Sequence, residues 1–200
     1  MIPFIRHGAA LVVSTAMLTA CGSSPAIHTY ELGSPAPAAT GVWSNAGLPI
    51  IELKTVSVPD YLDSSDILRS VGPNELTASP TGKWGERLSL GVTHALAAEL
   101  AERLPKVVIT ATPGAEPARR LLVDVEKFEI AADGQCLLSA RWRLTTADGE
   151  TTSSGEHGNF SAAAGSTGDA AIAVAMTQAV DQLADQIAQT VHHALGQHAG

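Results

Sequence analysis

Glu156 and His157 are the clearest candidates for acid–base chemistry, because a carboxylate and an imidazole are adjacent between Gly155 and Gly158. A positioned pair of this kind could act as a general base in a hydrolase. An exposed strand or edge loop would contain the same residues, and we favour that interpretation. The chain has neither a G-x-S-x-G nucleophile elbow nor an H-E-x-x-H zinc motif.

Three histidines near the C-terminus, His192, His193 and His198, are the other candidates. They could bind a metal ion weakly, but the end of a helix frays too much to form a rigid site. A solvated helix end explains these residues without a metal, because histidine interacts favourably with the carbonyl end of the helix dipole. We therefore predict no catalysis, no metal site and no cofactor.

Cys21 closes an N-terminal segment that has the layout of a secretory signal peptide. Arg6 and His7 form a short basic start, residues 8–17 are apolar and uncharged, and Leu18-Thr19-Ala20-Cys21 resembles the lipobox of bacterial lipoproteins. The apolar run is too short to span a bilayer, which needs about 20 residues. We predict a lipoprotein signal peptide over residues 1–20, a lipid anchor on Cys21 and a lipidated tether over residues 21–27. The alternative is an ordinary signal peptide followed by a chance cysteine.

The charge of the remaining chain limits its partners. Removing residues 1–20 takes away one of the 12 basic residues and none of the 20 acidic ones, which leaves a net charge of −9. This balance argues against binding nucleic acid, or an anionic lipid surface, through a basic patch. If Cys21 carries lipid, Cys136 has no cysteine partner and is most simply a small buried residue.

Hydrophobic periodicity predicts strands and helices in alternating groups. We expect a short extended piece at residues 28–32, strands at 49–58, 67–71, 74–78 and 107–110, and a helix over 85–104. The helix carries an apolar stripe that repeats every four residues from Leu88 to Leu104. Trp84, just before it, is predicted to be a core residue.

The second half predicts a hairpin followed by a long helix. Strands are expected at 120–130, with a bulge near Glu126, and at 136–144, where Cys136, Leu138, Ala140, Trp142 and Leu144 form a dry face. A third strand should run to about residue 160, and a helix from Asp169 to Leu195. We predict one α+β domain over residues 28–195, with a mixed, largely antiparallel sheet and two long helices packed on one face. Residues 196–200 would be a C-terminal tail.

The loop Pro59-Asp60-Tyr61-Leu62 is a candidate contact site for a partner protein or a second copy of the chain. Two bulky side chains follow a proline that ends a strand, and loops in such positions usually lie on the surface. Tyrosine is enriched at protein interfaces. The alternative is that Tyr61 and Leu62 fold back over the edge of the core.

Eight segments occur in a characteristic order and spacing: 30–32, 56–63, 66–68, 74–76, 83–88, Leu104-Pro105, 125–128 and 140–142. Together they resemble the ABC-type transport auxiliary lipoprotein family, the lipoprotein component of paraquat-inducible-type intermembrane transport systems. The resemblance covers residues 28–192 and leaves out the loop 33–47 and the tail.

The resemblance implies a non-enzymatic periplasmic lipoprotein that docks a transport system for lipids or other apolar solutes. Its partners would be an MCE-type substrate-binding protein and an ABC permease and ATPase, and a homo-oligomer is also compatible. Gly22 and Ser23 lack the aspartate that retains many lipoproteins in the inner membrane, so we expect the outer membrane. Two other functions remain open: a periplasmic hydrolase using Glu156 and His157, and a structural lipoprotein of the cell envelope.

Overall fold

Ten helices and strands make up the part of the chain that the computed structural model describes, namely residues 25–33, 47–112, 117–150 and 155–196. Their order is β1 (His28–Tyr30), β2 (Ile50–Leu53), β3 (Asp66–Gly72), β4 (Glu75–Trp84), α1 (Leu88–Arg103), β5 (Val108–Thr110), β6 (Arg119–Ile130), β7 (Gln135–Thr146), β8 (Glu156–Ala163) and α2 (Asp169–Gly196).

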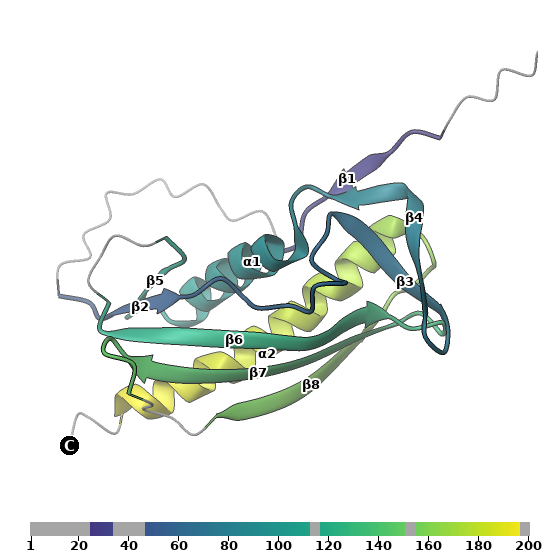
Figure 1. Cartoon of the computed structure of the whole chain (residues 1–200). Helices are drawn as coiled ribbons and strands as arrows, with labels where there is room; N and C mark the ends of the chain where they lie inside the picture. Colours follow the sequence, from purple (N-terminus) through teal and green to yellow (C-terminus); the bar gives the residue numbers. More distant parts are fainter. Residues whose placement is uncertain (1–24, 34–46, 113–116, 151–154, 197–200) are drawn as a thin grey trace, which may run out of the picture.

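The long strand β6 lies at the centre of one eight-stranded sheet (Figure 1). One edge of β6 pairs antiparallel with β7 along its whole length, and β7 pairs antiparallel with β8. The other edge is shared: β2 runs parallel to its first residues, and β3 meets its last residue, where Arg69 pairs with Ile130. Beyond these, β4 pairs with β3, β1 with β4, and β5 with β2. The sheet is mixed, as predicted.

Both helices pack on the same face of the sheet, which confirms the predicted architecture (Figure 1). The stripe of α1 is buried at Leu88, Val92, Leu96 and Leu100, and the stripe of α2 is buried from Ile172 to Val191. Neither helix combines the length and apolar character needed to cross a bilayer. The apolar faces of both helices are instead buried in the core between the helices and the sheet.

Strands β6 and β7 follow the predicted alternation closely. Cys136, Leu138, Ala140, Trp142 and Leu144 are all buried against the helices. The predicted bulge is present, because Val125 pairs with Ala140 and Lys127 pairs with Ser139, so that Glu126 is the extra residue. The turn glycines Gly134 and Gly149 have φ values of 83° and 94°, which glycine adopts without steric cost.

Three boundaries differ clearly from the prediction. The strand expected over residues 74–78 continues to Trp84. The strand expected over residues 49–58 ends at Leu53, because the chain then turns toward α1 and the Val56 N–H donates to Thr93 Oγ1 at 2.8 Å. The first helix begins at Leu88 instead of Gly85. Trp84 still belongs to β4, and the Gly85 N–H donates to the Tyr30 carbonyl, so backbone pairing with β1 delays the helix. Trp84 is buried, as expected.

Candidate partner-contact site

The loop from Pro59 to Asp63 is held in one compact shape by its own backbone. The Leu62 N–H donates to the Pro59 carbonyl at 2.8 Å, and the Asp63 N–H donates to the Asp60 carbonyl at 3.2 Å. Asp63 then fastens the loop to α1, because its Oδ1 accepts the Ser89 N–H at 3.0 Å. This hydrogen bond satisfies one of the free N–H groups in the first turn of the helix.

The charge of Asp63 is favoured at this position. Burial alone would raise the pKa of its carboxyl, but hydrogen bonds from Ser89 and the positive charge of Arg87 outweigh burial and lower the pKa. The carboxylate therefore stays ionised and continues to cap α1 as the pH falls toward its ordinary pKa. As a result, the loop is a fixed extension of the helix N-terminus.

Tyr61 and Leu62 point in opposite directions, which corrects one part of the prediction. Leu62 is 2% exposed and belongs to the core, whereas Tyr61 is 55% exposed. The prediction that Leu62 contributes to a contact surface is wrong, because the tight turn after Pro59 directs this side chain inward. Tyr61 is free to meet a partner.

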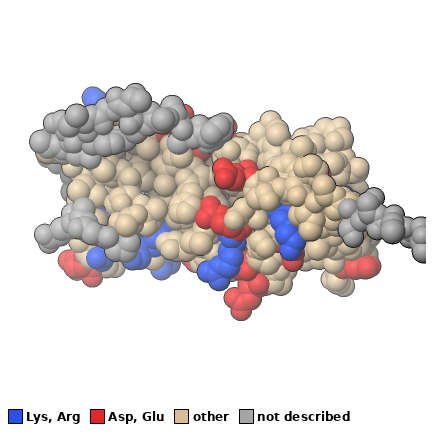
Figure 2. Space-filling view, turned by 90° about the horizontal axis from the view of Figure 1, so that it is seen from above, with Lys and Arg blue, Asp and Glu red and all other residues tan. Residues whose placement is uncertain are grey.

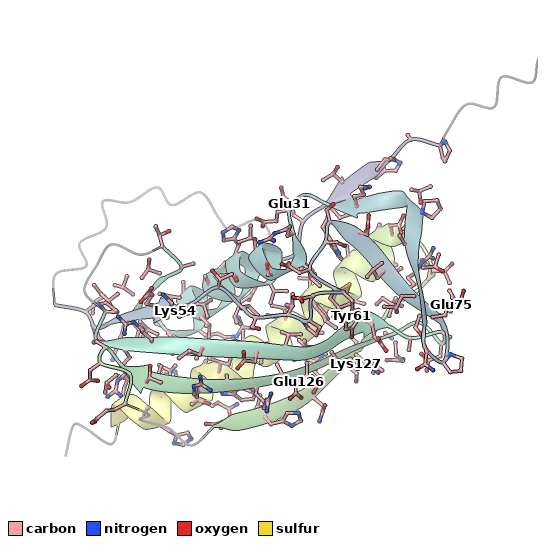
Figure 3. All side chains as sticks on the ribbon, viewed as in Figure 1. Glu31, Lys54, Tyr61, Glu75, Glu126 and Lys127 are labelled. Carbon is pink, nitrogen blue, oxygen red and sulfur yellow. The ribbon has the colours of Figure 1, made fainter. Side chains whose placement is uncertain are left out.

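Tyr61 borders an open cleft of about 530 Å³ on the sheet face opposite the helices (Figure 3). The other lining residues come from the β3–β4 hairpin and from β6: Ser70, Gly72, Pro73, Asn74, Glu75, Leu76, Lys127 and Glu129. The hairpin turn is tight, since the Asn74 N–H donates to the Gly72 carbonyl at 3.0 Å and Asn74 has a φ of 133°. Three segments that are distant in sequence thus form one surface.

Charged side chains and the ring of Tyr61 line this cleft together. Lys127 Nζ and Glu129 Oε1 lie 2.8 Å apart on β6. The Glu75 carboxylate lies over Gly72, within 3.6 Å of the position that a Cβ would take there. A half-exposed tyrosine ring beside carboxylates and a lysine can bind a polar or basic segment of another protein.

The candidate base pair Glu156-His157 is not brought together. Neighbouring residues of a strand point to opposite faces, and Glu156 lies on the helix side of β8 while His157 lies on the open side. His157 Nε2 instead lies 3.1 Å from Ser139 Oγ and 3.3 Å from Glu126 Oε2.

This serine, histidine and glutamate do not have the arrangement of a catalytic triad. A triad needs the carboxylate on Nδ1 and the serine on Nε2, but here both contact Nε2. Glu126 Oε1 also binds Arg141 Nε at 2.9 Å. These side chains form an exposed polar cluster across β6, β7 and β8. In the sequence, only the predicted bulge near Glu126, which turns this side chain outward, pointed to the cluster.

Some of the remaining candidate residues are described by the structure, and the others lie outside the described residues. His192 and His193 are exposed on the last turns of α2, and the described residues hold no group of three metal-ligating side chains. Cys136 is buried, and burial raises the pKa of its thiol to about 12. Cys21, the signal peptide, most of the tether and His198 lie outside the described residues.

A family model and a characterised relative both point to transport lipoproteins. The model of the family described as the ABC-type transport auxiliary lipoprotein component matches residues 30–188. The intermembrane transport lipoprotein PqiC of Escherichia coli K12 is 22% identical over 134 residues, which are 67% of this chain and 72% of PqiC.

Two crystal structures share the fold. An uncharacterized protein superposes with a TM-score of 0.69 at 21% identity, covering 83% of this chain and 99% of that protein. Protein XCC0632 from Xanthomonas campestris superposes with a TM-score of 0.65 at 18% identity, covering 88% of this chain and 97% of that protein.

Proposed function

The chain belongs to the ABC-type transport auxiliary lipoprotein family, and on this premise we propose that it docks an intermembrane transport system at a membrane of the cell envelope. The family match across residues 30–188 is the observation that carries the proposal, and the similarity to PqiC supports the intermembrane role. The transported material would be a lipid or another apolar solute.

The proposed anchor is an acylated Cys21, and the preferred membrane is the outer one. The support is the order of the N-terminal residues: a basic start, an apolar run, Leu18-Thr19-Ala20 and then the cysteine. An acyl anchor would hold the domain on the periplasmic face of the membrane. The domain itself would then act as a docking component.

The proposed partner is an MCE-type substrate-binding protein that works with an ABC permease and ATPase. We assign the contact to the cleft bordered by Tyr61, with Pro59 and Asp60 holding the loop in shape. Fixing the loop before binding lowers the entropy cost of docking. Tyrosine side chains with large exposed area are frequent among residues that dominate binding energy.

Replacing Tyr61 tests this contact without disturbing the core. We expect Tyr61→Ala to lower recovery of the MCE-type partner in co-purification by roughly tenfold, which corresponds to about 1.4 kcal/mol of binding free energy. Tyr61→Phe keeps the ring and serves as the matched control, with recovery close to that of the unchanged protein.

One result would count against the contact, and another would call for a second variant. Unchanged recovery and unchanged transport for Tyr61→Ala would make the loop a bystander. Loss of recovery together with loss of the circular dichroism signal would show that the variant unfolds. In that case Asn74→Gly, which changes another lining residue of the cleft, tests the same contact without straining the backbone, since glycine accepts the φ of 133° at that position. Lower recovery of the partner with this folded variant would support the contact, and unchanged recovery would count against it.

A further inference from the structure

Strand β8 forms an edge of the sheet that is left open. It pairs with β7 only, and no described strand lies on its other side (Figure 1). The other open edges are short or interrupted: β1 and β5 have three residues each, and the part of β4 not paired with β1 contains Pro80. Native proteins commonly protect sheet edges by such devices. β8 has eight residues, no proline and no register shift, so its edge is long and regular.

The edge of β8 also lacks the charged side chains that are common elsewhere on the surface. Figure 2 shows acidic and basic side chains next to one another near the middle of the face seen from above. By contrast, residues 157–168 contain no Asp, Glu, Lys or Arg. Lysine on an edge strand hinders pairing with another strand, because its charge would lose contact with water. No such charge opposes pairing along β8 after Glu156.

Alternate residues of β8 direct their backbone groups away from β7. In an antiparallel pair, the N–H and C=O of one residue point to the same side, and this side alternates along the strand. The Ser161 carbonyl points outward, since it accepts a hydrogen bond from Gln182 Nε2 on α2 at 3.0 Å. The backbone N–H groups of His157, Asn159 and Ser161 therefore point outward and have no hydrogen-bond partner among the described residues. An extended peptide offers acceptors at the matching spacing.

An open cleft lies on each side of this edge. One, of about 400 Å³, lies between β8 and α2 and is lined by Gly158, Phe160, Gln182 and Gln186, among others. The Phe160 ring lies over Gly158, because a Cβ added there would be 2.6 Å from Phe160 Cζ. The other cleft, of about 340 Å³, is on the open face of the sheet. An added strand points its side chains alternately to the two faces, so each cleft can receive one of them.

Arg143 gives the second cleft a charge that is not matched. It is exposed on β7 and lines this cleft with Asp124 and Glu156. Neither of these, nor any other carboxylate among the described residues, forms an ion pair with Arg143. Gly155 lies between Arg143 and the edge, and a Cβ added there would meet no atom within 4 Å. The Arg143 side chain can therefore reach a strand added beyond β8, about 10 Å from β7.

We propose that β8 accepts an extended segment of a partner protein as an added strand, and that an acidic residue of this segment binds Arg143. The backbone of the segment would bond to Asn159 and its outward-facing neighbours, and a carboxylate can meet the guanidinium with two parallel hydrogen bonds. This surface goes beyond the proposed function. It shares no lining residue with the Tyr61 cleft, so the two sites can be tested separately.

A second copy of the chain fits this edge less well. Antiparallel pairing of two β8 strands would place the uncharged end of one strand, up to Ala163, opposite the start of the other, so Arg143 would gain no carboxylate. It would also bring the two α2 helices together on the same face of the joined sheet. Asp185, whose side chain is 59% exposed beside the cleft, would then approach its own copy, and like charges oppose such a contact.

Amide hydrogen exchange of the full-length protein, measured by NMR, tests for an added strand. The probe is a synthetic peptide as long as β8 that alternates valine and threonine and carries one glutamate. We expect saturating peptide to slow the outward amides of His157, Asn159 and Ser161 roughly tenfold, since each gains a hydrogen bond or shelter from water. The amides of Gly158 and Phe160 already bond to β7 and should change by less than about twofold.

Two comparisons separate the backbone contact from the charge contact. Asn159→Pro removes an outward N–H without removing a bond to β7, and Asn159→Ala is its matched control because it keeps the N–H. We expect the proline variant to bind the peptide roughly tenfold more weakly and the alanine variant to bind it unchanged, as measured by fluorescence polarisation. Arg143→Gln should weaken binding roughly fivefold, and it should have no effect on a peptide whose glutamate is replaced by glutamine.

Exchange that millimolar peptide leaves unchanged would overturn the added strand, and so would a folded Asn159→Pro that binds as tightly as Asn159→Ala. Should Asn159→Pro lose its circular dichroism signal, the exchange pattern of the unchanged protein decides instead. Equal effects of Arg143→Gln on both peptides would refute the acidic contact. Outward amides that are already slow without peptide, in a protein whose size by light scattering is that of a dimer, would mean that a second copy occupies the edge, which overturns the proposal as well.

Discussion

Individual residues in this fold are held by partners from distant segments. Trp142 on β7 donates from Nε1 to Thr190 Oγ1 on α2 at 3.0 Å, and its ring centroid lies 6.4 Å from that of Phe160 on β8. The Thr190 hydroxyl in turn donates to the Gln186 carbonyl. One side chain therefore ties the long helix to two strands.

Trp142→Ala should lower the free energy of unfolding by about 3–5 kcal/mol, the range for removing a large buried side chain. Trp142→Phe should cost less, about 1–2 kcal/mol, because it keeps most of the apolar volume and loses the hydrogen bond. Chemical denaturation measures both. A loss below about 1 kcal/mol for the alanine variant would place the ring at the surface.

Position 82 has room only for glycine, because the carboxylate of Asp169 lies directly beside it. Asp169, at the start of α2, accepts hydrogen bonds from Ser79 Oγ at 2.8 Å and Thr81 Oγ1 at 2.7 Å. A Cβ at Gly82 would lie 2.6 Å from Asp169 Cγ, which is closer than real contacts allow.

Gly82→Ala should therefore displace Asp169 and lower the free energy of unfolding by about 1–3 kcal/mol. Gly165→Ala is the control, because no atom lies within 4 Å of its added Cβ. Thermal or urea unfolding distinguishes the two. Similar stabilities would show that Asp169 does not hold the β4–α2 junction.

At the scale of elements, the two helices are joined by one arginine. Arg103 on α1 binds Glu99 on the same helix, and Asp181 and Asp185 on α2. Burial raises the pKa of Glu99, and nearby Asp181 raises it further although Arg103 opposes both. Because the folded pKa lies above the ordinary value of 4.5, the contribution of Glu99 to stability is present below that value and is lost as the pH rises through the folded pKa.

Arg103→Met should leave three carboxylates without their cation. We expect the free energy of unfolding to fall by about 1–2 kcal/mol at pH 7, a moderate value because both aspartates are well exposed to solvent. The loss should be smaller near pH 4.5, because the raised pKa keeps more of Glu99 protonated in the folded protein. Urea unfolding at both pH values tests this, with Arg143→Met as a control, because Arg143 is exposed on β7. A loss at pH 4.5 as large as that at pH 7 would contradict the charge explanation.

At the scale of the molecule, the two faces of the sheet differ. One face of the sheet is covered by helices and the other is open, where the Tyr61 cleft lies (Figure 3).

Cys21→Ser should abolish membrane attachment while leaving the domain folded. In the proposed function an acyl anchor on Cys21 supplies the membrane affinity, and no described helix is long and apolar enough to replace it. Membrane fractionation combined with lipid labelling measures the change, and circular dichroism checks the fold. Normal fractionation and normal labelling of this variant would disprove the anchor.

The sequence by itself determined the secondary structure of the long elements and the faces they bury. The alternation from Cys136 to Leu144 and the four-residue repeat from Leu88 to Leu104 are local patterns, and every predicted core position in them is buried. The extra residue at Glu126 was also visible as a change of phase within one strand. Periodicity is enough for these features because a strand or helix repeats its own geometry along the chain.

Only the tertiary structure decided which distant residues meet. Tyr61 and Leu62 have similar sequence character, and a turn in the loop sends one outward and the other into the core. His157 meets Glu126 on another strand instead of its neighbour Glu156, because adjacent strand residues face opposite sides. The cleft beside Tyr61 combines residues of a loop, of the β3–β4 hairpin and of β6. Its position follows from strand order and loop packing, which local sequence patterns do not contain.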